Sequence, residues 1–260
     1  MSACQRPKAL DLYSGEGGSA HGYCLAGFNP YGVEKDPARA KFYPYAVHIG
    51  DVLEVLVTLI MGGAVDFTHP DGRVEWLSLR DFAVAHASPP CQGYSRGTVA
   101  LPDRADKYDR LIAVTRDLLR QTGLPWIIEN VMGARPELRT PFMLCGRMFG
   151  LTAIDTDGTP LTLDRHRLFE TSLDLTLMVH PPPHPEHGPG QVAGVYGGAR
   201  RDKTEAREIR KGGYVPADIE VLRALIGAPW MSETGLFLSI PPAYTTWIGR
   251  QLLDAIEAAA

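Results

Sequence analysis

The first half of the chain alternates short apolar runs with segments of helical periodicity, and this alternation limits the fold more than any other feature. Strands are expected over residues 8–15, 31–36, 46–52, 73–90 (one or two strands) and 125–131. Helices are expected between them, over residues 19–28, 37–46, 52–62 and 107–123, and again over 241–260. Strands that alternate with helices in this way form a mostly parallel α/β sheet.

The alternation of apolar runs and helical segments becomes weaker after Glu170. The stretch HPPPHPEHGPG excludes a helix or a central strand, because proline lacks a backbone donor and fixes φ. A small, loop-rich insert is therefore expected up to about Glu233. With 260 residues the chain can bury a full core, so we expect one main domain with a small appendage.

The net charge and the distribution of cysteines limit the partners and the cellular compartment that we expect for the protein. A net charge of −4 gives no general attraction to nucleic acid or to an anionic membrane, so a nucleic-acid partner requires a local positive surface. No apolar stretch reads as a signal peptide or a membrane span. The four scattered cysteines are typical of reduced thiols in a cytoplasmic protein.

A glycine-rich turn, DLYSGEGG at residues 11–18, joins the first strand to the first helix. Glycines there permit a tight turn and a close approach of the backbone to a ligand. Glu34 and Asp51 follow near the ends of the next two strands, where a carboxylate can accept from ribose hydroxyls or an adenine amino group. The turn alone could be purely structural, but the three features together predict an adenosine-containing cofactor. No G-x-x-x-x-G-K-[ST] motif is present, which disfavours a nucleoside triphosphate.

Three further motifs carry reactive groups. Cys91 lies in HASPPCQGYS, a sharp turn where a thiol could be a nucleophile or a bystander. Glu129 ends the apolar run IIENV, and taken alone it could simply cap the next turn. Arg165 and Arg167, in DRHRLFE, would share one face of a strand, either in a site or at a solvated edge.

Taken in order, these motifs closely resemble those of the DNA (cytosine-5)-methyltransferase family. The family's signatures are D-L-F-S-G-x-G-G, P-C-Q, E-N-V and R-x-R. The likeness covers residues 10 to about 170 and returns over 239–252, within the segment SIPPAYTTWIGRQLL. The resemblance implies a Rossmann-like, S-adenosylmethionine-dependent methyltransferase sheet. It places the catalytic domain at residues 1–170 plus 236–260 and a reduced target-recognition region at 171–235.

The resemblance also implies a role for each motif residue. Cys91 would add to C6 of a flipped-out cytosine, Glu129 in its protonated form would meet N3, and Arg167 would meet O2. Arg165 would brace the catalytic loop or the base. The residues implied in cofactor binding are Tyr13 (adenine), Ser14, Gly15, Gly17 and Gly18 (methionine part), Glu34 (ribose), Asp51 (adenine amino group) and Pro90 (sulfonium).

Double-stranded DNA is the implied partner, and no obligate protein partner is evident. Only about 65 residues separate Glu170 from Gly235, a layout that resembles short phage-encoded cytosine methylases. Within that insert, YGGARRDKTEAREIRKGG would offer phosphate contacts, although a solvated helix would give the same pattern. The residues expected to contact nucleic acid are Gln92, Ser95, Arg96, Arg200, Arg201 and Lys203.

Several alternatives remain open at the level of sequence. The same fold could act on cytosine in RNA, or the chain could be a silent DNA-binding or anti-restriction module. An amino-methyltransferase would need an aromatic residue where Cys91 stands. The histidines at 180, 184 and 187 raise the question of zinc, but no C-x-x-C accompanies them, and a plain proline-rich loop without metal is expected.

Overall fold

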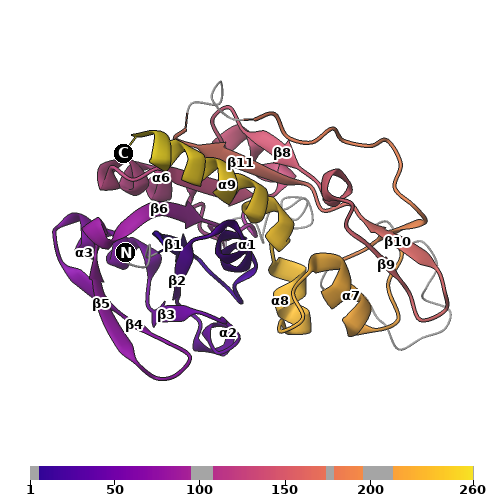
Figure 1. Cartoon of the computed structure of the whole chain (residues 1–260), viewed down its shortest axis with the longest axis horizontal. Helices are drawn as coiled ribbons and strands as arrows, with labels where there is room; N and C mark the ends of the chain where they lie inside the picture. Colours follow the sequence, from indigo (N-terminus) through magenta and orange to yellow (C-terminus); the bar gives the residue numbers. More distant parts are fainter. Residues whose placement is uncertain (1–5, 95–107, 174–178, 196–212, 260) are drawn as a thin grey trace, which may run out of the picture.

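The computed structural model describes residues 6–94, 108–173, 179–195 and 213–259, and its centre is one nine-stranded sheet (Figure 1). The strands of this sheet are β1 (Lys8–Leu12), β2 (Asn29–Glu34), β3 (Ala46–Ile49), β4 (Ala64–Thr68), β5 (Val74–Ser78), β6 (Phe82–Ala87), β7 (Trp126–Asn130), β8 (Phe142–Leu144) and β11 (Arg167–Thr171).

The strand order is β5-β4-β3-β2-β1-β6-β7-β11-β8. The five central strands β3, β2, β1, β6 and β7 run parallel, whereas β4, β5, β11 and β8 pair antiparallel at the two edges. The chain moves outward from β1 to β3 and then returns to place β6 on the other side of β1. This reversal creates a crevice at the carboxyl ends of β1 and β6, where open α/β sheets bind ligands.

Helices cover both faces of the sheet. The helices are α1 (Gly18–Ala26), α2 (Pro37–Ala40), α3 (Val52–Ile60), α6 (Ile112–Thr122), α7 (Ile219–Ile226), α8 (Glu233–Leu238) and α9 (Pro242–Ala259), with 3₁₀ turns η1 (Leu79–Asp81), η2 (Met132–Glu137) and η3 (Gly146–Phe149). Alternate residues of each strand face opposite layers: Leu10 and Leu12 join the core under α3 and α6, while Ala9 joins the core under α1 and α9.

The close packing of α1 against α9 depends on glycine. A Cβ at Gly22 would lie 2.0 Å from Thr245 Oγ1, and a Cβ at Gly249 would lie 2.7 Å from Ala26. The Thr245 hydroxyl donates to the Ser19 carbonyl over 2.9 Å. The closing helix is therefore fixed directly to the helix that follows the glycine-rich turn.

A second, three-stranded sheet lies beside the first, to the right in Figure 1. It pairs β9 (Thr152–Ile154), β10 (Pro160–Leu163) and β12 (Gln191–Ala193), and with α7 it encloses its own apolar cluster. It thus takes strands from both sides of residue 170, the expected domain boundary, which stays a prediction. Residues 179–190 form neither helix nor strand, as their prolines predict.

Local expectations differ from the structure in several places: helix α6 begins at Ile112 rather than at 107, and helix α7 lies within the insert expected to be loop-rich. The helix expected over 37–46 is a single turn, α2, because Pro44 cannot continue it. Strand β4 was not expected, and strand β11 begins only at Arg167, so Arg165 and Arg167 do not share a strand face. Within the described ranges, no helix combines the length and apolarity that a membrane crossing requires.

Candidate active site

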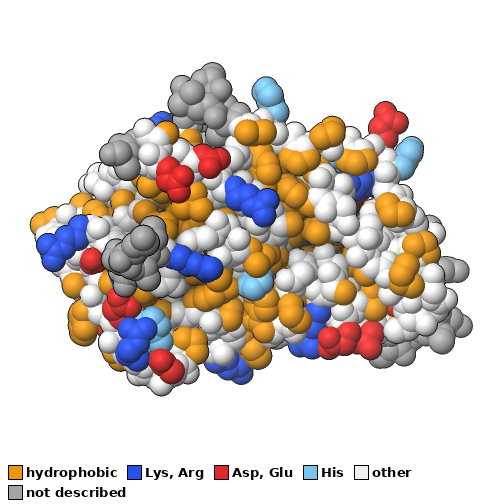
Figure 2. All heavy atoms as spheres, viewed as in Figure 1, with side chains coloured by type: hydrophobic (Ala, Val, Ile, Leu, Met, Phe, Trp, Pro, Cys, Tyr) orange, Lys and Arg blue, Asp and Glu red, His pale blue; other side chains and the backbone are white. Residues whose placement is uncertain are grey.

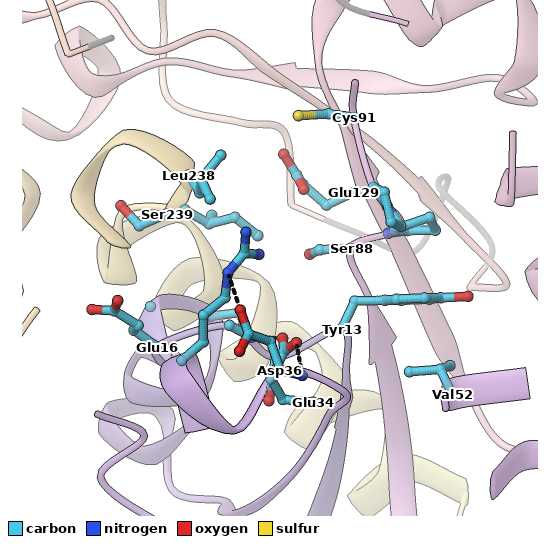
Figure 3. Close-up of a pocket in the computed structure, with 18 of the residues that line it drawn as sticks. Tyr13, Glu16, Glu34, Asp36, Val52, Ser88, Cys91, Glu129, Leu238 and Ser239 are labelled. Carbon is cyan, nitrogen blue, oxygen red and sulfur yellow. Dashed lines mark hydrogen bonds and ion pairs between the residues drawn. The ribbon is translucent and has the colours of Figure 1, made fainter. Parts of the chain in front are cut away.

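A cavity of about 370 Å³ opens at the carboxyl ends of β1, β2, β6 and β7. Figure 3 shows Cys91 and Glu129 at one end, Glu34 and Asp36 at the other, and Leu238 and Ser239 across from them. Of the residues expected to act or to bind cofactor, those lining it are Tyr13, Ser14, Gly15, Gly18, Glu34, Asp51, Pro90, Cys91, Glu129 and Arg167.

The glycine-rich turn forms the floor of the cavity. Gly15 and Gly17 have φ of 55° and 87°, in the region that favours glycine, and Tyr13 adopts φ 58° despite its side chain. Such a conformation at a non-glycine residue is retained where the surrounding structure holds it, commonly at ligand sites. Gly17 itself does not line the cavity: a Cβ there would lie 2.8 Å from Pro44 Cδ.

Glu34 closes this turn from the end of β2. Its two carboxylate oxygens accept from the backbone amides of Gly15 and Asp36, each over 2.9 Å. Each oxygen keeps a further lone pair for a hydroxyl. Asp51 lies two residues beyond β3, where Oδ1 caps α3 by accepting from the Leu53 amide over 2.8 Å.

Two buried polar atoms at the cavity have no hydrogen-bond partner among the described residues: Ser14 Oγ and Gln92 Oε1. Buried polar atoms are nearly always paired, so both are suited to a bound polar ligand. Gly15 and Gly18 form a cradle beside these atoms, and a Cβ at Gly18 would lie 2.4 Å from the Ile240 carbonyl. The cradle and the two polar atoms together fit a cofactor that carries hydroxyl and amino groups.

Cys91 and Glu129 come from neighbouring strand ends. The Asn130 side chain donates to the Pro89 carbonyl over 2.9 Å and so fastens the end of β7 to the Pro-Pro-Cys turn. Glu129 is 6% exposed, and Arg167 forms an ion pair with it at 3.0 Å between Nε and Oε1. The thiol, the carboxyl and the guanidinium therefore line the same wall.

Burial has the largest effect on the pKa of both Cys91 and Glu129. It raises the pKa of Glu129, while Arg167, Arg165 and a hydrogen bond from Ser88 lower it. It also raises the pKa of Cys91; the charge of Glu129 adds to that rise, and the two arginines oppose it. The two arginines thus favour the thiolate, but their effect on the pKa of Cys91 is smaller than that of burial.

Arg165 does not itself line the cavity. It donates to the carbonyls of Ser239 (2.8 Å), Val195 (3.1 Å) and Phe237 (2.6 Å), and burial lowers its pKa to about 9. In this structure it braces the segment that enters α9. A role toward the catalytic loop or a base stays a prediction.

Two supporting features escaped the sequence analysis. A buried hydrogen-bonded chain runs from the Tyr23 hydroxyl to His86 Nδ1 (2.9 Å), from His86 Nε2 to Ser88 Oγ (2.9 Å), and from Ser88 to Glu129. Burial lowers the pKa of His86 to about 3, so this imidazole is neutral. His86 near the end of β6 and Ser88 just after it were visible in the sequence, but their partners were not.

The second feature is Glu16, in the middle of the glycine-rich turn. Its carboxylate accepts from the amide and hydroxyl of Ser232 over 2.7 and 2.5 Å, and its carbonyl accepts from Trp230 Nε1 over 2.8 Å. The cavity floor is thus tied to the chain just before α8, 216 residues away. A separation of this size leaves no local signal in the sequence.

The expected nucleic-acid surface is described only in part. Gln92 lines the cavity, whereas Ser95, Arg96, Arg200, Arg201 and Lys203 lie outside the described residues. On the face shown in Figure 2, the described lysine and arginine side chains are scattered singly among hydrophobic and neutral ones. A positive surface for DNA therefore remains a prediction, and the residues expected to form it lie mostly outside the described residues.

No protein-family model and no curated protein matches the chain. Its fold is similar to that of a solved structure assigned as a DNA modification methyltransferase encoded within an E. coli prophage, with TM-score 0.56, 14% identity, and 96% and 99% of the two chains covered. It is also similar to the Dnmt2 methyltransferase of S. pombe, with TM-score 0.51, 13% identity and the same coverage. A DNMT2 mutant of Spodoptera frugiperda gives TM-score 0.50 and 12% identity over 95% and 99% of the two chains. At these identities the likeness concerns the fold alone, and it confirms the predicted Rossmann-like α/β fold.

Proposed function

We propose that the chain is an S-adenosylmethionine-dependent DNA (cytosine-5)-methyltransferase that acts on a flipped-out cytosine through a covalent adduct at Cys91. The observation that carries this proposal is the meeting of a thiol and a buried carboxyl, Cys91 and Glu129, in the cavity that the glycine-rich turn also lines. The likeness of the fold to nucleic-acid methyltransferases supports it.

Bound S-adenosylmethionine would supply an electrophilic methyl group. Glu34 would accept from ribose hydroxyls with the lone pairs that the turn leaves free, and Asp51 would accept from the adenine amino group. Ser14 Oγ, which has no partner among the described residues, would gain one in the methionine part. Pro90 would face the sulfonium, and Tyr13 the adenine ring.

The chemistry at the base requires Cys91 as thiolate and Glu129 as neutral acid. The thiolate would add to C6, the ring electrons would move to C5, and C5 would take up the methyl group as the bond between that methyl group and the cofactor's sulfur breaks. The C5 proton would then pass to water as the C6–sulfur bond breaks, which restores the ring and frees the thiolate. Glu129 would hydrogen-bond to N3 and disperse the negative charge that the addition creates.

Burial alone favours the protonated thiol, but the protonation states of the two groups are coupled. An ionised Glu129 raises the pKa of Cys91, so protonation of the carboxyl makes it easier for the thiol to lose its proton. Burial, which raises the pKa of Glu129, moves the carboxyl toward its neutral form. A neutral Glu129 thus favours the thiolate of Cys91, and by the same coupling the thiolate favours a neutral Glu129.

The decisive experiment is covalent trapping on duplex DNA that contains 5-fluorocytosine, with S-adenosylmethionine present. Fluorine at C5 cannot leave as a proton does, so a working enzyme should stay bound, and mass spectrometry should find one adduct at Cys91. Cys91→Ser should lose the adduct, while Cys24→Ser, a change at a thiol outside the cavity, should keep it.

If no adduct forms on duplex DNA, two explanations can be distinguished. An adduct on single-stranded RNA but on none of a set of varied duplexes would replace DNA by RNA as substrate. Measurable cofactor binding with no adduct on either nucleic acid would favour a silent binding module. A phage origin is a further expectation that this experiment does not address.

A further inference from the structure

A cysteine and two histidines from three separate segments converge outside the cavity. Cys145 lies between β8 and η3, His166 directly precedes β11, and His184 belongs to the proline-rich segment 179–190. One potential ligand atom from each lies within 4.8 Å of the others. In the sequence His184 stands beside His180 and His187, whereas its potential co-ligands in the fold come from elsewhere in the chain.

The two imidazoles are arranged as they would be around a shared ion. Their Nε2 atoms face each other at 3.2 Å, and their ring centroids are 5.3 Å apart with an interplanar angle of 17°. Zinc binds imidazole nitrogen at about 2.0–2.1 Å, so two nitrogens at a tetrahedral angle would be separated by about 3.3 Å. The observed separation therefore already suits a tetrahedral ion.

The neighbouring residues fix this arrangement. Arg147, in η3, donates to the Glu186 carbonyl and forms an ion pair with Asp164, so it fastens the proline-rich segment next to His184. A Cβ at Gly188 would lie 2.4 Å from Thr162 Oγ1, which shows how closely the segment lies on β10. The Asp164 carboxylate also lies 3.8 Å from the sulfur of Cys145, where its charge favours a nearby cation.

We propose that Cys145, His166 and His184 bind one zinc ion. One thiolate and two imidazoles form the donor set that zinc prefers, and a fourth position would be open to water or another side chain. The ion would join the proline-rich segment to the residue between Arg165 and Arg167. Its role would be structural, and it does not depend on the methyltransferase proposal.

The first test is the metal content of the whole protein. After purification without chelator, mass spectrometry of the metals should find about one zinc per chain. After removal of the metal, Co²⁺ should restore thiolate-to-metal charge-transfer bands and the intense d–d bands of a tetrahedral site. A protein without zinc that also gives no such bands at stoichiometric Co²⁺ would overturn the proposal.

Matched variants identify the ligands. His184→Ala, on an exposed segment, should weaken Zn²⁺ affinity at least tenfold, because even partners outside the first coordination shell contribute about 10- to 100-fold. Cys145→Ser should also abolish the charge-transfer bands. The control variants His180→Ala and Cys24→Ser should retain both affinity and bands, since neither residue belongs to the cluster. Equal behaviour of His184→Ala and His180→Ala would also overturn the assignment.

Discussion

The change Glu170→Gln should destabilise the protein more than any other single charge removal we consider, because it leaves a buried cation without its counterion. Arg116 donates to Glu170 twice, from Nε to Oε1 over 2.6 Å and from Nη2 to Oε2 over 2.7 Å. The two side chains are 5% and 3% exposed. Glu170 Oε2 also accepts from the Arg139 amide over 2.8 Å. The pair thus links α6 to β11, the strand that begins at Arg167.

The magnitude follows from this burial. Removing one member of a buried pair costs about 3–5 kcal/mol, whereas an exposed pair contributes about 0–1 kcal/mol. Glutamine keeps one acceptor oxygen for Arg116 but places an amide donor against the other guanidinium nitrogen. We therefore expect about 3 kcal/mol, a large fraction of the about 5–15 kcal/mol by which a domain is stable.

Equilibrium unfolding in urea measures this loss, provided that the slope m is unchanged by the variant. Glu220→Gln is the control: it removes a carboxylate that also pairs with an arginine, Arg223, through one contact, but that is 64% exposed, so its cost should stay below about 1 kcal/mol. Replacing both buried partners, as in Arg116→Met with Glu170→Leu, should recover most of the loss. If Glu170→Gln costs no more than Glu220→Gln, the reasoning from burial is wrong.

Three further predictions concern groups around the cavity. Glu129→Gln should slow methyl transfer about 10²- to 10⁴-fold and leave the calorimetric cofactor affinity unchanged; an equal loss of both would contradict a role in the chemical step. Ser88→Ala removes a hydrogen bond that lowers the Glu129 pKa, so the alkaline limb of the pH–rate profile should move to higher pH; an unmoved limb would remove Ser88 from this role. Burial raises the pKa of Asp11 from 3.8 to about 7, so the folded protein keeps a proton that the unfolded chain loses. Its free energy of unfolding should therefore fall as pH rises from about 4 to about 7, by about 4 kcal/mol at most, and Asp11→Asn should flatten this dependence in urea titrations.

The central part of the fold could be predicted from the sequence because its signals are local. Each parallel strand is a short apolar run, and each helix after it carries its own start or stop, such as the Asp51 cap of α3 or Gly123 after α6. The edge strand β4 lacked such a signal. Asp66 interrupts its apolar run, and of its five residues only Val65 and Phe67 are buried.

The candidate site was predictable to the extent that its residues follow strand ends. Parallel strands bring their carboxyl ends to one edge, so the motifs around Gly15, Cys91 and Glu129 had to meet once the sheet formed. The contacts of Glu16 with Ser232, and of His166 with His184, depend on how the later part of the chain folds back. No periodic pattern in the sequence predicts where the later part of the chain folds back.

Four consecutive residues before and at the start of β11 contact four different parts of the molecule. Asp164 pairs with Arg147 of η3, Arg165 holds the segment entering α9, His166 meets His184, and Arg167 pairs with Glu129. Because these residues are adjacent, none can shift far without moving its neighbours. A displacement of the proline-rich segment or of the entry to α9 would therefore reach the Arg167–Glu129 pair through one or two peptide units. This short connection gives the region expected to recognise DNA a physical route to the carboxyl expected to act on the base.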